Sequence, residues 1–487
     1  MTTYQKRGLI VGVAVLLVLV ILGIVIFGSG GNDDPGNNPP DDGWEDIDIS
    51  NKKIDINFLH IWPEHAKSFE QIVANFEKNN PNINVNIQSS TYSSIDSSLQ
   101  GAYNGGKVPD VFFYWTHGVS QWVNQDIKLA EDITDIYYNV HKNEFISDGD
   151  CFISGQINNR YYNVPFRATG FVIYYNKTIF EEYGWEKPDT LEEFEALLQQ
   201  IKEDSELTPL HLWGVAGTFL YARTSLIAYA DVISGRASDP NYRSGRLTQD
   251  DAYLDLLAEI YEKVRDWGGI KKYFGGSPLG SSTEGAEQAL LNGECAMAML
   301  NNNSLGVLQA ESEDEFGVFS FPAPAMMNDP SAGYVHGGYD GFCLSALSSP
   351  EKKAAALKFL EYLCGDEAMQ LFANNEGSIM ARKSVTYTDP LQQDVAKSMR
   401  RAGVMGTFPQ YKGSEATGGI GQSISSYCSG NSGSLERARE LALNEYNSTV
   451  LDVTDTIMNP EKFQMIEPTY TVNQEELDKF IAWLRTR

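Results

Sequence analysis

The sequence lacks the short motifs of the common hydrolases, metalloproteases and nucleotide-binding enzymes. It has no HExxH zinc motif, no GxSxG nucleophile turn and no Walker-type phosphate loop. Its five cysteines include no CxxC pair, so a zinc site is disfavoured and no metal is expected. Buried free thiols are the expected state of these cysteines, and one disulfide is the alternative outside the cell.

Positive charge is also scarce. The chain has 37 Lys and Arg against 65 Asp and Glu, which gives a formal net charge of −28. This balance argues against a nucleic-acid partner, because phosphate binding needs clustered basic residues. The hydrophobic content of 42% suits a globular protein, and 487 residues are too many for one core, so two or more lobes are expected.

The N-terminus departs from this composition. An uncharged apolar run, 9–27, follows Lys6 and Arg7 and has the length of a membrane-spanning helix. We predict an uncleaved anchor, with residues 1–8 in the cytoplasm and the rest outside. The alternative is a cleaved signal peptide, although "FGSGGNDD" offers only a weak cleavage site. Residues 28–53 are rich in Gly, Pro, Asn and Asp and are predicted to form a flexible linker.

From Ile54 onward, strand patterns alternate with helix patterns. "IDINFLHIW", "INVNIQ" and "VPDVFFYW" read as strands, and the amphipathic segment between the first two reads as a helix with a buried stripe of Phe69, Ile72, Val73 and Phe76. This alternation predicts an α/β fold, in which ligands bind at the carboxyl ends of the strands.

Residues 171–203 read as a strand, a short helix, a proline turn and a second helix. Thr190 and Glu193 predict a capping box at the second helix, and Gly184 predicts a left-handed end to the first. A later helix is predicted to begin at Pro350 and to end at Gly365.

Taken in order, several segments resemble the sugar-binding family of extracellular solute-binding proteins of ABC importers, the maltose-binding-protein-like family. The resemblance covers residues 54 to about 385 and fades after about 400. The resemblance rests on the segments "FEQIVANFEKNNPNINVNI", "GGKVPDVFFYW", "VIYYNKTIFEEYGWEKPDTLEEF", "GECAMAML" and "SSPEKKAAALKFLEYL".

The resemblance implies two α/β lobes joined by a hinge, the type II fold of periplasmic binding proteins. Residues 54–166 and 340–390 are expected to form lobe 1, and residues 167–339 and 391–487 lobe 2. The crossings fall near "VPFRATG" and "VHGGYDG", where glycines permit the backbone rotation of hinge closure. Further helices of lobe 2 are expected after residue 400.

The implied function is a membrane-tethered receptor that closes on a carbohydrate, or another small polar solute, and presents it to ABC permease subunits. It needs no covalent chemistry, cofactor or nucleic acid. One alternative is a receptor of the same fold that reports its ligand to a sensor kinase. Another is an extracellular glycan-processing enzyme, which needs only two carboxylates, and 65 acidic residues supply such pairs by chance. A purely structural surface protein is disfavoured by the aromatic residues at predicted strand ends.

Sugar pockets combine flat aromatic rings with hydrogen-bonding side chains. In "FLHIWPEH", a loop after the first strand would place His60, Trp62 and Glu64 at the rim of the cleft. In the alternative interpretation, His60 is an ordinary strand residue and Trp62 caps the following helix.

"DVFFYWTHGVSQW" carries the next candidates. Strand alternation sends Phe112 and Tyr114 to one face and Phe113 and Trp115 to the other, and one pair is expected in the core. The resemblance implies ligand contacts at Tyr114, Trp115 and His117, whereas Trp122 is expected to pack inside the lobe.

Further candidates lie at the predicted crossings and before an apolar helix. Arg167 offers paired hydrogen bonds to sugar hydroxyls, and its alternative role is a hinge salt bridge. The resemblance implies contacts at Tyr221 and Arg223, which are otherwise helix-start residues. At the second crossing, Tyr339 and Asp340 face either the ligand or the hinge.

The segment "AMAMLNNNSL" departs from the family, which usually has a glycine and a stacking tryptophan here. Amides of Asn301, Asn302 and Asn303 would replace stacking by polar contacts, and a plain turn is the alternative. Met380 stands where the family often has proline.

Overall fold

The computed structural model describes residues 43–487 with internal gaps. The residues left out within that range are 92, 115–118, 120–121, 123–126, 147–150, 153–155, 158–159, 213–217, 236–250, 276–281, 313, 328–334, 400–401, 405–419, 431 and 445–472. The predicted anchor lies outside the described residues, and no helix within them is long and apolar enough to cross a bilayer. Residues 45–487 form one compact unit, to which the following description applies.

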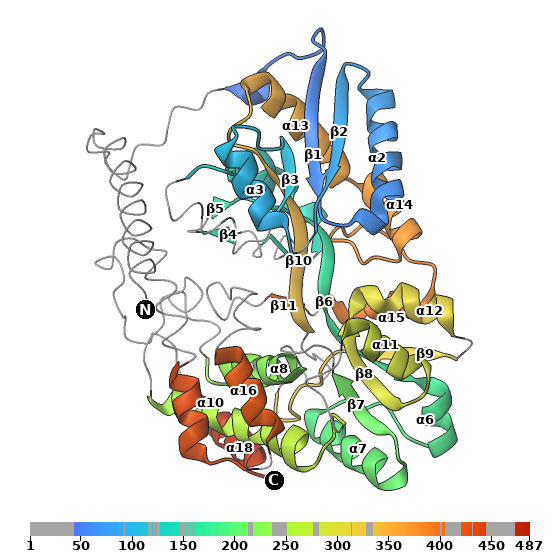
Figure 1. Cartoon of the computed structure of the whole chain (residues 1–487), viewed down its shortest axis with the longest axis vertical. Coiled ribbons are helices and arrows are strands. Elements are labelled where there is room, and N and C mark those ends of the chain that lie inside the picture. Colours follow the sequence, from blue (N-terminus) through green and yellow to red (C-terminus); the bar gives the residue numbers. More distant parts are fainter. Residues whose placement is uncertain are drawn as a thin grey trace, which may run out of the picture. The chain divides into compact units, whose positions relative to one another are not determined.

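A single mixed sheet organises this unit (Figure 1). Its nine strands in the described part of the chain follow the order β2-β1-β3-β10-β6-β8-β7, with β11 beside β10 and β9 beside β6. Strand β1 is parallel to β2 and β3, while β10 is antiparallel to β3 and β6. The strands are β1 (Ile54–His60), β2 (Ile83–Ser89), β3 (Val111–Phe113), β6 (Val164–Asn176), β7 (Thr208–Leu212), β8 (Cys295–Asn301), β9 (Phe316–Phe319), β10 (Val335–Leu344) and β11 (Ala402–Val404), and a small hairpin joins β4 (Gln156–Ile157) to β5 (Arg160–Tyr161).

Helices connect and cover these strands. The α-helices are α2 (Ala66–Asn79), α3 (Ile95–Asn104), α5 (Asn139–His141), α6 (Lys177–Tyr183), α7 (Leu191–Asp204), α8 (Thr218–Ile233), α10 (Asp251–Arg265), α11 (Thr283–Leu291), α12 (Leu305–Glu311), α13 (Pro350–Leu363), α14 (Asp366–Glu376), α15 (Pro390–Met399), α16 (Ile420–Ser429) and α18 (Gln474–Leu484). Short helical turns include η2 (Pro63–His65), η7 (Asp266–Ile270) and η9 (Asn302–Ser304).

The local sequence signals are confirmed. The predicted apolar stripe of α2 is buried along its whole length. Thr190 and Glu193 form the capping box of α7, and Gly184 ends α6 in the left-handed region with φ of 71°. Helix α13 begins at Pro350 as predicted and ends at Leu363. These features depend on residues close in sequence, which is why the sequence predicts them.

The strand β3 shows one correction. Phe112 and Phe113 point to opposite faces of the sheet, yet both are fully buried, so the expectation that only one face is core was wrong. Strand β3 is buried on both faces, whereas the edge strand β2 alternates buried and exposed residues. In this part of the core the ring of Phe58 lies 5.2 Å from those of Phe342 and Phe359.

The helices expected after residue 400 are present. Ile424 on α16 and Phe480 on α18 join the core that also contains Leu257 of α10 and Phe194 of α7. A neighbouring core lies between β6, β8, α11 and α15. All five cysteines are buried and none forms a disulfide, which confirms the expected free thiols.

Strands β6 and β10 run side by side and connect the β1–β3 part of the sheet to the β7–β8 part (Figure 1). Their antiparallel register pairs Arg167 with Asp340 and Ala168 with Tyr339, and it shifts between Asp340 and Gly341. Both predicted crossing segments therefore meet in one two-stranded ribbon.

At Gly341 the ribbon leaves no room for a side chain. A Cβ atom would come within 2.0 Å of the Asn163 Oδ1 atom and 2.3 Å of the Val164 carbonyl oxygen. We predict that Gly341→Ala lowers the free energy of unfolding by about 1–3 kcal/mol, because backbone has to move. Gly101→Ala on α3, where a Cβ meets nothing within 4 Å, is the control and should stabilise by about 0.5–1 kcal/mol. Urea unfolding measures both, and an equal effect of the two substitutions would contradict the prediction.

Candidate functional site

The β6–β10 ribbon carries a buried ion pair. The Nε atom of Arg167 lies 3.3 Å from the Oδ2 atom of Asp340, and each side chain is 4% exposed. The guanidinium also lies over the ring of Trp62, with 4.0 Å from its carbon to the ring centroid. The fold thus brings together Trp62, Arg167 and Asp340, three candidates that are far apart in the sequence.

Two residues that sequence analysis missed complete this cluster. The Nε2 atom of His65 lies 3.4 Å from the Nη1 atom of Arg167, and its Nδ1 atom lies 2.6 Å from the Oε2 atom of Glu376. The hydroxyl of Ser68 donates to the other oxygen of Glu376. We call His65, Arg167, Asp340 and Glu376, with the ring of Trp62, the crossing cluster. His65 had a sequence signal, because it ends the "HIWPEH" segment, but nothing local indicates Glu376.

The loop after β1 differs from the expectation. His60 is 1% exposed and Trp62 is fully buried, so they do not form a rim in this structure, while Glu64 is exposed. The chain turns at Pro63 into η2, which folds the Trp62 ring back beneath Arg167 and between Phe69 and Phe166. His60 is the last residue of β1, as the alternative interpretation held, and Trp62 directly precedes η2 without a side-chain cap bond.

His60 sits in an aromatic environment that disfavours its charged form. Its ring stacks on that of Phe69 at 4.5 Å, and its Nδ1 atom accepts a hydrogen bond from the Trp62 backbone N–H at 3.2 Å. Burial, helped by the charge of nearby His65, lowers the pKa of His60 to about 4.

We therefore predict that the His60 ring protonates near pH 4, well below the ordinary value of 6.5. Because the folded-state pKa is depressed, His60 contributes stability above pH 6.5, and this contribution is lost as the pH falls toward 4. A pH titration of the side-chain ¹⁵N resonances measures the value directly. His60 in an unfolded peptide spanning residues 56–64 is the reference, and equal midpoints in peptide and protein would refute the prediction.

A second polar group lies along the same ribbon. Thr169 shares a face of β6 with Arg167 and is half-buried, and its hydroxyl accepts a hydrogen bond from the Asn301 amide at 3.3 Å. Asn303 and Tyr339 are also half-buried. Thr169 was missed by sequence analysis, although strand alternation from Arg167 would have indicated it. We call Thr169, Asn301 and Asn303 the polar shelf; Tyr339 pairs with Ala168 and therefore lies on the opposite face of the ribbon.

Asn302 has a different role from its neighbours. It is 1% exposed, its Nδ2 atom donates to the Ala168 carbonyl at 3.2 Å, and its Oδ1 atom accepts from the Gly170 N–H at 2.8 Å. Both ends of the amide therefore hold the β6 backbone. The alternative, a turn, is present as η9, within which Asn302 anchors the backbone, and the ligand contacts of these asparagines stay a prediction.

The remaining candidates contact other partners or lie outside the described part. Tyr114 donates its hydroxyl to Asp96 at 2.9 Å and accepts from the indole of Trp122 at 3.4 Å, and burial raises the pKa of Tyr114. Trp122 is buried, as predicted. On α8, Arg223 is buried and donates to the Tyr261 hydroxyl at 2.9 Å. Trp115 and His117, together with the side chain of Tyr221, lie outside the described residues.

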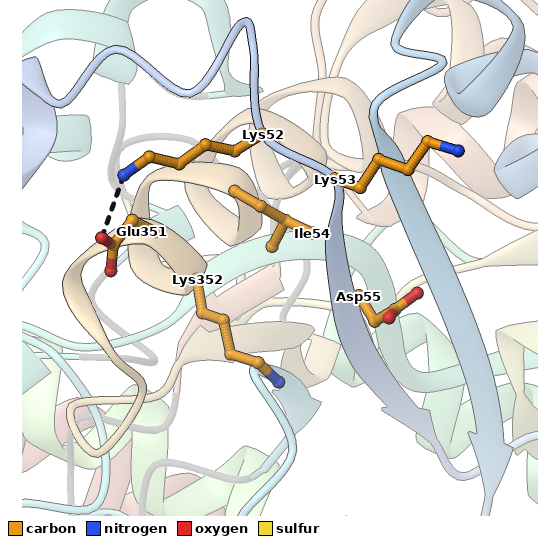
Figure 2. Close-up of a pocket in the computed structure, with 6 residues that line it drawn as sticks. All are labelled: Lys52, Lys53, Ile54, Asp55, Glu351 and Lys352. Atoms are coloured by element: carbon orange, nitrogen blue, oxygen red, sulfur yellow. Dashed lines mark hydrogen bonds and ion pairs between the residues drawn. The ribbon is translucent and has the colours of Figure 1, made fainter.

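A surface hollow of about 610 Å³ lies at the amino end of β1 (Figure 2). Figure 2 shows Lys52 paired with Glu351 across its edge, at 3.1 Å, while Lys53 and Lys352 point away from each other. Because ligands of α/β sheets bind at the carboxyl ends of strands, and β1 ends at His60, this hollow lies at the wrong end for the ligand site.

Comparison with known proteins identifies the family of this chain. A family model for bacterial extracellular solute-binding proteins matches residues 71–399. The chain is 28% identical over 354 residues to the multiple sugar-binding protein of Streptococcus mutans, a match that covers 70% of this chain and 78% of that protein. An extracellular-binding protein of an ABC transporter from Pyrococcus horikoshii is 24% identical over 367 residues, covering 71% of this chain and 76% of that protein.

Solved structures share the two-lobed α/β fold. The apo form of RafE from Streptococcus pneumoniae superposes with a TM-score of 0.65 at 21% identity, covering 82% of this chain and 98% of that one. A family 1 extracellular solute-binding protein from Bifidobacterium longum subsp. infantis gives 0.64 at 22% identity, covering 82% and 100%. With two thirds of its length matched by the family model, the chain belongs to the bacterial extracellular solute-binding proteins.

Proposed function

We propose that the chain captures a sugar or oligosaccharide outside the cytoplasm and delivers it to an ABC permease. The observation that carries this proposal is the family match over residues 71–399, which spans both parts of the sheet and the whole crossing ribbon. A sugar-binding relative and the similarity to RafE, whose complex with raffinose superposes with a TM-score of 0.61, favour a carbohydrate. Family members of this kind bind rather than transform their ligands.

In this proposal the ligand is held between two lobes, 54–166 with 340–390 and 167–339 with 391–487. The β6–β10 ribbon joins them, so its bending would open and close the site. A ligand that contacts both lobes shifts the population toward the closed form by its extra affinity for that form. The half-buried polar shelf supplies hydrogen-bonding groups beside the ribbon, and the exposed Glu64 supplies a carboxylate.

The predicted ligand contacts divide accordingly. Asn303, Tyr339 and Glu64 keep exposed atoms for a sugar, and Trp115, His117 and Tyr221 remain predictions from the sequence. The buried groups His60, Trp62, Tyr114, Arg167, Arg223, Asn302 and Asp340 would support the site from behind unless the lobes move apart. We further propose that residues 9–27 anchor the protein in the membrane and residues 28–53 tether it.

Thermal-shift screening of the full chain in detergent tests the proposal. A ligand that binds only the folded state stabilises that state by mass action and so raises the melting temperature. At a ligand concentration one hundred times Kd, the free energy of unfolding rises by about 2.7 kcal/mol. The panel should contain raffinose, maltose, chitin oligosaccharides, xylo-oligosaccharides, amino acids and short peptides. Hits are confirmed by calorimetry, and the Asn303→Ala and Thr169→Val variants should weaken them.

Three outcomes would count against the proposal. A hit confined to amino acids or peptides would replace the sugar by another solute. Turnover of any glycan in the panel would defeat the binding-only mechanism. Uptake that persists without this protein, in cells that keep the permease, would separate it from transport.

A further inference from the structure

The contacts of His65 determine which of its ring nitrogens carries the proton. Arg167 can only donate hydrogen bonds, because a guanidinium has no acceptor. The Nε2 atom of His65, 3.4 Å from Arg167 Nη1, must therefore be the unprotonated acceptor. The proton then sits on Nδ1, which lies 2.6 Å from the Glu376 carboxylate in an electrostatic contact rather than an aligned hydrogen bond. The neutral Nδ1–H tautomer is the one form of the ring that satisfies both neighbours.

A second proton would break this arrangement. Protonated His65 carries N–H groups on both nitrogens, so Nε2 would face the Arg167 Nη1 donor with a donor of its own and with like charge. The contact with Glu376 would remain and become an ion pair. His65 would stay with α14, and Arg167 would lose its link to the start of α2.

The charged groups around His65 come from every element packed against it. Glu64 of η2 lies 3.9 Å from Nε2, Glu376 closes α14, and Arg167 of β6 leads on to Asp340 of β10. His60 of β1 is near enough for the charge of His65 to lower the pKa of His60. Burial lowers the pKa of His65, Arg167 acts in the same direction, and Glu376 and Glu64 oppose both, so the ring is neutral at pH 7.5.

We propose that His65 is a proton-controlled contact between the α2 segment and the crossing ribbon: the neutral imidazole joins Glu376 to Arg167, and protonation releases Arg167. The released guanidinium keeps Asp340 and the ring of Trp62 as partners but loses its hydrogen bond to the His65 ring of η2. Because Arg167 and Thr169 share one face of β6, the release is transmitted to the polar shelf. The last consequence is a lower affinity for the sugar at acid pH, and only this consequence rests on the proposed function.

Histidine ¹⁵N labelling of the full chain in detergent tests the tautomer. The chain has six histidines, so a long-range ¹H–¹⁵N correlation resolves few signals, and His65→Gln assigns the relevant one. At pH 7.5, His65 should show a protonated Nδ1 and an unprotonated Nε2. His60, whose Nδ1 accepts the Trp62 N–H, should show the opposite tautomer and serves as the internal reference. An Nε2–H tautomer or a charged ring for His65 at this pH overturns the proposal.

The His65→Gln variant also provides a control that cannot titrate. Its carbonyl can accept from Arg167 while its amide donates to Glu376, so both contacts are kept at every pH. The Nε–H resonance of Arg167, assigned with Arg167→Lys, should shift in the wild type as the pH is lowered from 7.5, with the same midpoint as the His65 ring. It should stay in place in His65→Gln. A signal that moves equally in both proteins, or in neither, refutes the release of Arg167.

A third variant separates the two neighbours of the ring. Glu376→Gln removes the carboxylate that favours the protonated ring, so the Arg167 transition should move to lower pH. An unchanged or higher midpoint would contradict the assignment of Glu376. For any sugar that raises the melting temperature, affinity should fall about fivefold across the same transition in the wild type, the size of one hydrogen bond, and not in His65→Gln. If no sugar binds, the proposed function fails while the Arg167 signal still decides this proposal.

Discussion

Asp340→Asn is expected to lower the free energy of unfolding by about 3–5 kcal/mol, among the largest effects of any single substitution in this chain. The substitution keeps the size of the side chain but removes the charge that faces Arg167 across the β6–β10 ribbon. Both side chains are 4% exposed, so water cannot replace the lost partner. Removing one member of a buried ion pair leaves the other charge buried without its counter-charge, which is the costly case. Urea unfolding followed by tryptophan fluorescence measures the loss.

Two further variants show whether burial is the cause. Lys479 and Glu475 form an ion pair on α18 with side chains 57% and 80% exposed, so Glu475→Gln should change stability by less than about 0.5 kcal/mol. The double substitution Arg167→Met with Asp340→Leu removes both charges and should recover most of the loss. If Asp340→Asn costs no more than the surface variant, the pair does not hold the ribbon. If the double variant loses as much unfolding free energy as Asp340→Asn, the loss comes from side-chain shape rather than from the buried charge.

The fold was predictable wherever its determinants are local. The capping box of Thr190, the left-handed Gly184 and the buried stripe of α2 depend on residues a few positions apart, and all are found as predicted. The α/β class and the crossing segments followed from periodicity and from family resemblance. The pairing of β6 with β10 did not, because its register joins residues far apart in the chain.

The site was predictable in its residue types but not in their exposure. Trp62 and His60 have the composition of a sugar-binding loop, but the same aromatic residues serve equally well in a core. The chain turns at Pro63, and the Trp62 ring is buried beneath Arg167 instead of exposed at a rim. The loop sequence does not indicate this burial, since the residues that contact Trp62 come from α2 and β6.

The roles of the polar residues Asn302 and Glu376 could not be predicted from the sequence either. A run of asparagines suggests a ligand-binding wall, but the amide of Asn302 bonds the β6 backbone at both ends and also donates to the Asn303 side chain. Glu376 appears as an ordinary helix-end residue until α14 is placed against the start of α2, where it meets His65 and Ser68. Roles of this kind depend on tertiary contacts, which local patterns in a single sequence do not predict.

The second large effect is expected at Glu195, in the core formed by α7, α10 and α18. The Nζ atom of Lys263, on a side chain that is fully buried, lies 2.7 Å from Glu195, and the indole of Trp267 donates to the same carboxylate at 2.8 Å. Lys263 also donates to the Thr486 carbonyl at 2.6 Å and lies over the ring of Trp483. One carboxylate thus satisfies a buried cation and a buried indole where the C-terminal residues pack against α10. Burial lowers the pKa of Lys263, and Glu195 opposes that shift, so the charge depends on this partner.

Glu195→Ala should therefore cost about 3–5 kcal/mol of unfolding free energy, because it leaves a buried ammonium group without its counter-charge. Glu195→Gln keeps an acceptor for Trp267 and should cost less, while Glu182→Ala at an exposed position of α6 should stay within about 0.5 kcal/mol. Amide hydrogen exchange adds a spatial readout: protection should fall in α18 before it falls in α2, since Thr486 and Trp483 share the lysine. A loss below about 1 kcal/mol, or equal exchange in both helices, would mean that Lys263 is neutral in the folded protein and that apolar packing alone holds the C-terminal helix.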